Sequence, residues 1–81
     1  MREQALQFLD ALGGPENIIE IEGCITRLRG TVVDPGKIDA AKLKELQIRG
    51  EPIIKGKVVQ IVVGTYAEMI ATEMNKIMRS K

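Results

Sequence analysis

The residues best suited to chemistry lie in one short segment, residues 24–29, which reads Cys-Ile-Thr-Arg-Leu-Arg. It holds the only cysteine of the chain, and the sequence contains no histidine, so neither an internal disulfide nor a zinc site is expected. The hydroxyl and the two guanidiniums that follow the thiol are typical of a site for a phosphoryl group. Nearby cations also increase the thiolate fraction of a cysteine, which is its nucleophilic form. We therefore interpret Cys24 as a phosphoryl acceptor.

Both arginines of this segment lie on one face of a strand predicted over residues 26–33. Because side chains alternate between the two faces of a strand, Arg27, Arg29 and Thr31 share one side. The other side, with Leu28 between the two arginines, is apolar. The strand is therefore expected to bury its apolar face and to present two guanidiniums close to the thiol.

The chemistry of phosphoryl transfer assigns a role to each residue of the segment. The reaction depends mainly on positioning and on stabilising the charge of the phosphoryl oxygens, so hydrogen-bond donors matter more than general bases. Backbone N–H groups at a turn can serve this purpose as well as guanidiniums. The candidate site consists of the thiol of Cys24, the guanidiniums of Arg27 and Arg29, the hydroxyl of Thr26, and the backbone N–H groups of Ile25 and Thr26.

The remaining sequence predicts helices and strands around this segment. Apolar residues at helical spacing indicate helices, and runs rich in β-branched residues indicate strands. The predicted elements are a helix over residues 3–12, a strand over 18–22, the strand over 26–33, a helix capped by Asp39, strands over 51–54 and 58–63, and a helix that starts at Thr65.

Single residues carry further expectations within these elements. In the first strand, Ile19 and Ile21 should face the same side because they are two residues apart. Gly23 should permit a sharp turn, and Gly50 should end the second helical segment. Pro52 restricts its strand to an edge of the sheet or a strand start, because proline has no N–H group to donate.

The order of the elements is α-β-β-α-β-β-α, which predicts an α+β fold. Two hairpins with one apolar face per strand are best satisfied by a four-stranded antiparallel sheet that carries all three helices on one face. The other face is then open to partners. A chain of 81 residues is long enough for one small domain that buries roughly 60% of its unfolded surface, so residues 1–81 are expected to form a single domain.

The segment of residues 24–29 resembles the phosphorylation-site motif of the enzyme IIB domain of the bacterial phosphoenolpyruvate:sugar phosphotransferase system, in its glucose/sucrose (glucose/N-acetylglucosamine-like) family. The spacing of other residues agrees with this family over nearly the whole chain: Gly13-Gly14, Glu16-Asn17-Ile18, Asp34, Ile38-Asp39, Leu43, Leu46, Gly50, Val59-Gln60 and Gly64-Thr65. The resemblance implies the same antiparallel architecture. It also implies a phosphotransferase, and neither a cofactor nor a metal is expected.

The resemblance further implies a reaction and its partners. A histidine of phosphorylated enzyme IIA would donate its phosphoryl group to Cys24, which would pass it to a sugar bound by the membrane component IIC during uptake. No run of the sequence approaches the roughly 20 apolar residues that span a bilayer, so the chain is expected in the cytoplasm, at the inner face of the membrane through IIC. The sequence does not determine which sugar is transported.

Other functions agree less well with the sequence. A net charge of +1 and the absence of tryptophan argue against nucleic-acid binding. One alternative stays open: a non-transferring regulatory or interaction module that uses the arginine face to bind an anion or a nucleic acid. A cysteine phosphatase needs arginine six positions after the cysteine, where this chain has Gly30. A thiol redox function would need a second, resolving cysteine.

Overall fold

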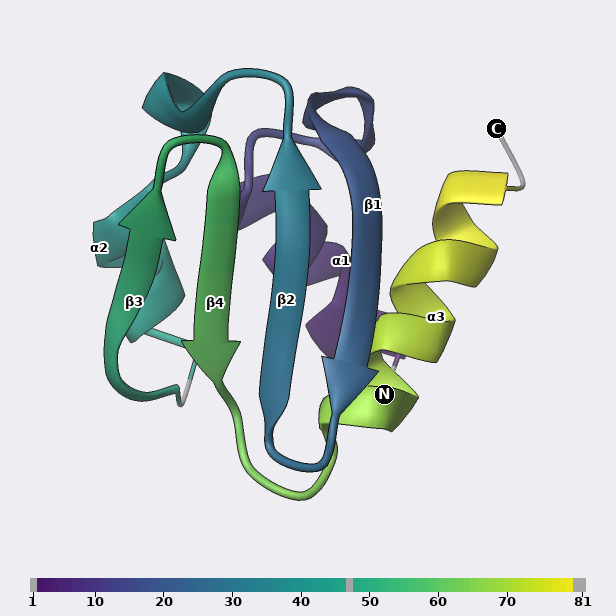
Figure 1. The fold of residues 1–81 in the computed structure, drawn as a ribbon. Coiled ribbons are helices and arrows are strands. Elements are labelled where there is room, and N and C mark those ends of the chain that lie inside the picture. The colour runs from purple at the N-terminus through teal and green to yellow at the C-terminus, as the bar shows by residue number, and fades with distance from the viewer. Residues whose placement is uncertain (1, 47, 80–81) are drawn as a thin grey trace.

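A computed structural model gives the structure of the chain and describes residues 2–46 and 48–79 (Figure 1). In chain order the described elements are α1 (Arg2–Ala11), a 3-10 helix (Pro15–Asn17), β1 (Ile18–Cys24), β2 (Arg27–Val32), a second 3-10 helix (Pro35–Lys37), α2 (Ala40–Lys44), β3 (Arg49–Lys55), β4 (Val58–Val62) and α3 (Ala67–Arg79). The predicted order of α-helices and strands is confirmed. None of the helices in these two described ranges is both long and apolar enough to cross a lipid bilayer.

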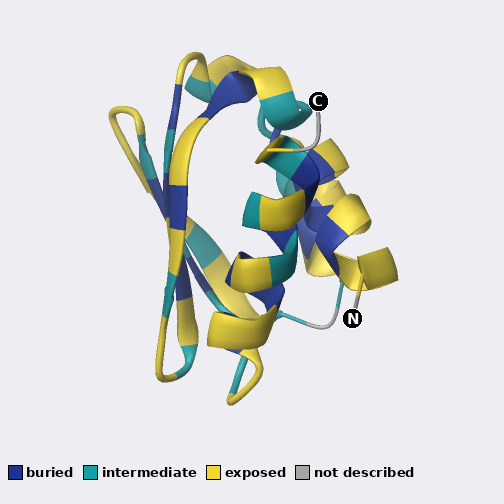
Figure 2. Ribbon diagram, turned by 90° about the vertical axis from the view of Figure 1, so that its right-hand side faces the viewer, coloured by how far each residue is buried: buried dark blue, intermediate teal, exposed yellow. Residues whose placement is uncertain are grey.

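The strands form one antiparallel sheet in the order β1-β2-β4-β3. β2 therefore lies in the interior of the sheet. Pro52 belongs to β3, an edge strand, as predicted. The helices cover one face of the sheet and leave the other face open (Figure 2). The predicted α+β fold class, with its three helices on one face, is confirmed.

The hydrophobic core lies between the sheet and the helices. Its largest fully buried side chains come from both layers, namely Leu9, Leu12, Leu43 and Met74 on the helical side and Leu28, Val32, Val59 and Ile61 on the sheet. In β2 the alternation follows the prediction, since Leu28 and Val32 are buried and Arg27 is exposed. Burying one such side chain contributes about 1.5–3 kcal/mol. The core therefore fixes the position of the strand that carries both candidate arginines.

Capping interactions fix the segment between β2 and α2. The carboxylate of Asp34 accepts a hydrogen bond from the N–H of Gly36 (2.9 Å). The carboxylate of Asp39 accepts one from the N–H of Lys42 (3.0 Å), which confirms Asp39 as the cap of α2. Lys42 also forms an ion pair with Asp10, and this hydrogen-bonded carboxylate raises the pKa of Lys42 above its usual value. The ion pair connects α2 to α1.

Two expectations about the strands are wrong, because the sheet contains irregular pairings. Ile21 is buried but Ile19 is 61% exposed. The register of β1 and β2 shifts between Ile18 and Glu20, and this β-bulge changes which side chains of β1 face the core. Gly50 does not end α2. It lies inside β3 with φ 76°, in a stretch where the register of β3 and β4 also shifts.

Candidate functional site

A two-residue turn, Ile25 and Thr26, connects β1 to β2 and lies at the centre of the candidate site. Cys24 is the last residue of β1 and pairs with Arg27, the first residue of β2. Residues directly opposite each other in an antiparallel pair project from the same face. The exposed thiol and the guanidinium therefore both lie on the open face of the sheet, at the lower end of the view in Figure 1.

Arg29 lies on the same face, two residues farther along β2. It is opposite Glu22 of β1 on one side and the half-buried Gln60 of β4 on the other. No ion pair within the described ranges includes Arg27 or Arg29. Both guanidiniums therefore keep their hydrogen-bond donors for an external anion, and Gln60 adds a polar group beside them.

The turn is strained and firmly held. Ile25 has φ 29°, a backbone region that β-branched residues rarely adopt, and it is 74% exposed. The carbonyl oxygen of Thr26 accepts hydrogen bonds from the N–H groups of Val63 (2.9 Å) and Gly64 (3.1 Å) in the loop between β4 and α3. Among the described residues, no turn or loop hydrogen bond is donated by the N–H of Ile25 or of Thr26. These two donors can therefore bind a ligand.

Gly23 has a different function from the predicted one. It lies within β1, opposite Leu28 and on the face that carries the helices, so it forms no part of the turn. A Cβ atom at this position would lie 2.5 Å from the carbonyl oxygen of Ala67 and 2.7 Å from the Cα of Glu68. The glycine therefore lets the start of α3 pack directly against β1, beside the residue that precedes the turn.

Replacing Gly23 with valine should lower the free energy of unfolding by about 3 kcal/mol. The new side chain would overlap backbone atoms of α3, which can move only if the helix moves. Urea unfolding measures this change. Glu20→Val, at an exposed position of the same strand, is the matched control and should change the stability by less than about 0.5 kcal/mol. Equal losses in both variants would contradict the close packing of α3 on β1.

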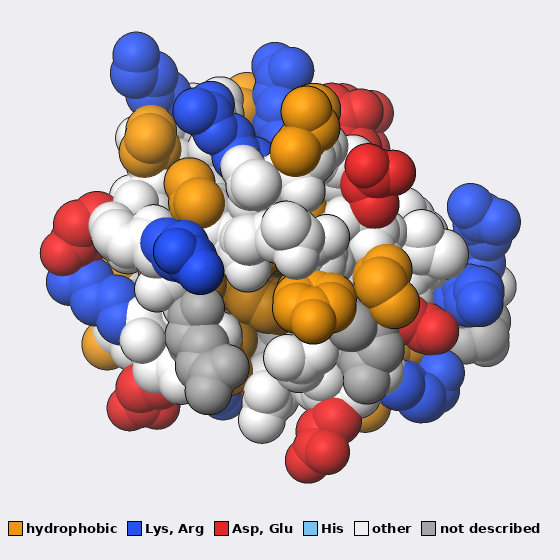
Figure 3. All heavy atoms as spheres, turned by 90° about the horizontal axis from the view of Figure 1, so that it is seen from below, with side chains coloured by type: hydrophobic (Ala, Val, Ile, Leu, Met, Phe, Trp, Pro, Cys, Tyr) orange, Lys and Arg blue, Asp and Glu red, His pale blue; other side chains and the backbone are white. Residues whose placement is uncertain are grey.

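The structure adds a third arginine to this end of the sheet. Arg49 begins β3 and pairs with Val62 of β4, which in turn pairs with Arg27. Seen from this end of the molecule, basic side chains lie next to hydrophobic ones (Figure 3). The sequence shows Arg49 as an added charge before Gly50 but does not place it near Arg27, because the register that connects the two through β4 is set by the folded sheet.

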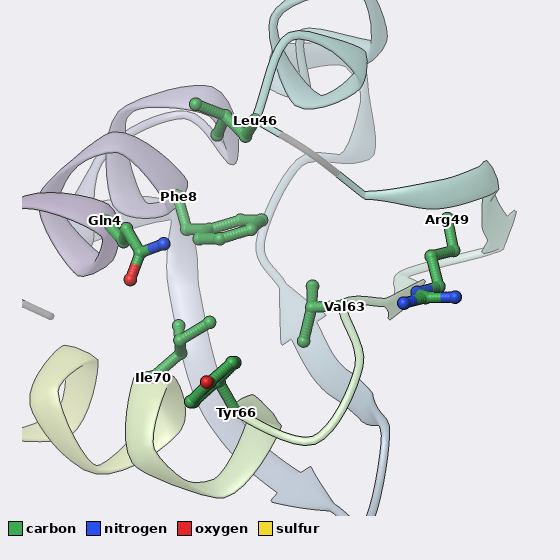
Figure 4. Close-up of a pocket in the computed structure, with 7 residues that line it drawn as sticks. All are labelled: Gln4, Phe8, Leu46, Arg49, Val63, Tyr66 and Ile70. Carbon is green, nitrogen blue, oxygen red and sulfur yellow. The ribbon is translucent and has the colours of Figure 1, made fainter.

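Two hollows meet at Arg49. The first, of about 390 Å³, is called here the Thr26 hollow and is lined by Thr26, Arg49, Val62, Val63, Gly64, Thr65 and Tyr66. The second, of about 350 Å³, is called the Phe8 pocket and is lined by Gln4, Phe8, Leu46, Arg49, Val63, Tyr66 and Ile70. In Figure 4, Phe8 and Leu46 lie on one side of this pocket and Arg49 on the other. Cys24 lines neither hollow and is exposed on the sheet face.

The arrangement around the turn is suited to nucleophilic transfer of a phosphoryl group. A thiolate can attack phosphorus, while guanidinium and backbone donors stabilise the charge on the phosphoryl oxygens. The thiol lies on an open face, which a protein partner can approach. Within residues 2–46 and 48–79, no group of three or more His, Cys, Asp or Glu side chains could hold a metal ion.

Comparison with known proteins identifies relatives over nearly the whole chain. The family model described as "phosphotransferase system, EIIB" matches residues 7–39. A protein named PTS system N-acetylglucosamine-specific EIIB component, from Streptomyces coelicolor, is 44% identical over 79 residues, which cover 96% of this chain and 100% of the relative.

In longer relatives, the segment that matches this chain is a small part of the whole protein. N-acetylglucosamine-specific EIICBA components of the PTS from Klebsiella pneumoniae and Escherichia coli are 38% and 34% identical, over 95% of this chain and 12% of each relative. A crystal structure of one domain of the PTS system IIabc component from Clostridium difficile superposes with a TM-score of 0.72 at 26% identity, and the match covers 96% of this chain and 78% of that one.

Proposed function

The chain belongs to the enzyme IIB family of the phosphotransferase system, whose members are phosphoryl carriers for sugar uptake, and we propose that Cys24 is the residue that carries the phosphoryl group. The observation that supports this assignment is the pairing of Cys24 with Arg27 at the exposed end of the β1–β2 hairpin. The alternative, a regulatory module that transfers nothing, is not favoured.

In the first half-reaction the group arrives from a phosphohistidine of enzyme IIA. The thiolate sulfur of Cys24 attacks the phosphorus, an S–P bond forms, and the N–P bond breaks with its electron pair returning to the imidazole nitrogen. The guanidiniums of Arg27 and Arg29, the hydroxyl of Thr26 and the N–H groups of Ile25 and Thr26 hold the phosphoryl oxygens during this step. Donors placed around the oxygens stabilise the charge that spreads over them in the transition state.

In the second half-reaction a sugar hydroxyl attacks the phosphorus of phosphocysteine. An O–P bond forms, the S–P bond breaks with its electron pair returning to the sulfur, and the hydroxyl proton is lost to a base outside this chain. The phosphocysteine carries roughly −1.5 to −2 charge if it titrates like other phosphorylated side chains. The exposed position of Cys24 suits a carrier, because the same sulfur must reach a donor and then an acceptor.

The family and the relatives' names support a choice of partners. We assign the donor to an enzyme IIA and the acceptor to a sugar held by a membrane component IIC, with the chain held at the inner face of the membrane through IIC. Because the relatives are named N-acetylglucosamine-specific, N-acetylglucosamine is the first sugar to test. We also propose that residues 1–81 act as a single IIB domain, which agrees with the one hydrophobic core of the described residues.

Intact mass spectrometry tests the assignment of Cys24. The protein is mixed with phosphoenolpyruvate, the two general phosphotransferase proteins and an enzyme IIA at mildly alkaline pH. Wild type should gain the mass of one phosphoryl group, and iodine should remove it by attacking the S–P linkage. Cys24→Ser should unfold at the same urea concentration as wild type and should gain nothing. Full labelling of the folded Cys24→Ser protein would place the acceptor elsewhere.

A further inference from the structure

Arg49 is a basic residue near the candidate site that the proposed transfer does not use. It is exposed, and none of the ion pairs formed within the described ranges includes it. Its guanidinium lines the Thr26 hollow, and its Nε atom lies 3.8 Å from the position that a Cβ of Gly64 would occupy. Gly64 in turn donates a hydrogen bond to the carbonyl oxygen of Thr26. The arginine therefore borders the loop that holds the nucleophile's turn.

The register of the sheet sets the distance between Arg49 and the nucleophile. Cys24, Arg27, Val62 and Arg49 form one row across β1, β2, β4 and β3. Three strand spacings of about 4.8 Å place the Cα atoms of Arg49 and Cys24 roughly 14 Å apart. This distance is too long for Arg49 to hold a phosphoryl group on the sulfur. It suits contact with a protein surface that is docked over Cys24.

The charges of the open face indicate what kind of group Arg49 would contact. On this face Glu22 of β1 is opposite Arg29, while the exposed Glu51 of β3 forms an ion pair with Lys44 of α2. The other edge strand, β3, contributes Arg49 at the end close to the turn, with no acidic residue paired opposite it. An exposed cation without an ion-pair partner, at the edge of a surface, attracts an anionic partner and increases the rate at which the two proteins meet. The surface near Arg49 is therefore complementary to carboxylates.

We propose that Arg49 is a docking residue that binds an acidic side chain on the phosphoryl-donor protein, and this inference rests on the proposed function. The two half-reactions differ in charge. The donor brings an anionic phosphoryl group, which a cation near the site attracts, whereas the sugar hydroxyl of the acceptor is neutral. A cation on the rim therefore favours the donor step, and Arg49 adds to the binding of the donor without touching the migrating group.

The experiment measures the rate of phosphorylation of Cys24 at increasing concentrations of phosphorylated enzyme IIA. Arg49→Glu should raise KM for this donor about tenfold with kcat unchanged, because it replaces an attraction by a repulsion. Arg49→Lys should keep a KM close to that of wild type. Added salt should reduce the difference between wild type and Arg49→Glu, because salt screens exposed charges.

Lys57→Glu is the matched control. Lys57 is exposed, lies in the turn between β3 and β4 at the opposite end of the sheet, and undergoes the same change of charge. It should leave KM within about twofold of wild type, the range expected for a charge outside the interface. Equal KM values for the two glutamate variants would overturn the proposal, and so would a fall in kcat with unchanged KM.

Two further measurements separate this inference from the function on which it rests. If wild type itself accepts no phosphoryl group from any donor, the assignment of Cys24 fails, and with it the inference. If wild type is labelled normally, only the role of Arg49 is tested by the variants. Transfer from the phosphorylated protein to sugar should be equal in wild type and Arg49→Glu; a loss confined to this second step would assign Arg49 to the acceptor and overturn the proposal.

Discussion

Replacing Arg27 or Arg29 with alanine should lower the rate of phosphoenolpyruvate-dependent sugar phosphorylation by about 100-fold, the loss typical of removing one donor to a developing oxyanion. Both guanidiniums lie on the face that presents Cys24, and neither has an ion-pair partner among residues 2–46 and 48–79. Lysine should restore only part of the rate, because it keeps the charge but loses the planar fork that binds two oxygens. The rate is measured in the complete system, with enzyme IIA, IIC and sugar.

The control for these variants is Lys57→Ala, which removes an exposed charge from the turn between β3 and β4, at the other end of the sheet. It should leave the rate within about twofold of wild type, since distant surface charges are screened. Intact mass then separates the two half-reactions, because a variant that is labelled on Cys24 but does not pass the group on has lost the second step alone. A rate equal to that of wild type in Arg29→Ala would remove this residue from the site.

Replacing Asn17 with alanine should lower the free energy of unfolding by about 3 kcal/mol. Asn17 is a buried polar residue, 4% exposed. Its amide nitrogen donates to the carbonyl oxygens of Leu12 (2.8 Å) and Asp34 (3.0 Å), and its amide oxygen accepts from the N–H of Asp34 (2.9 Å). Alanine would leave these backbone groups without their partner in a region that water reaches poorly. The loop after α1 would then be held to the segment after β2 by backbone bonds alone, such as the one from the N–H of Val33 to the carbonyl oxygen of Asn17 (2.8 Å).

Urea unfolding measures the loss, and Asn75→Ala is its matched control. Asn75 also bonds to backbone, but through a single hydrogen bond to the carbonyl oxygen of Ile21 (3.1 Å) in a half-buried position. Its removal should cost about 1 kcal/mol. Asn17→Asp should fall between wild type and alanine, since it keeps the acceptor and loses the donors. Equal costs for Asn17→Ala and Asn75→Ala would show that the three side-chain hydrogen bonds of Asn17 contribute no more than the single one of Asn75.

Most of the architecture follows from local patterns in the sequence. The alternation around Leu28 predicted which face of β2 is buried, and the cap at Asp39 predicted the start of α2. Pro52 predicted an edge strand because a missing N–H excludes the sheet interior. Each of these features depends on residues that are close together in the chain, and such features can be inferred without knowledge of the fold.

The sequence by itself determined which groups of the candidate site are available for chemistry: one thiol, a hydroxyl and two arginines within residues 24–29, spaced so that a hairpin presents them together. Only the tertiary structure decided the exposure of Ile19, the function of Gly23 and the position of Arg49. The bulge beside Ile19 depends on the pairing of β1 with β2, and Gly23 leaves space for a helix that begins at Ala67. Arg49 lies at the same end of the sheet as Arg27 because both pair with Val62 of β4. These features depend on register and packing between residues far apart in the chain, which no local pattern specifies.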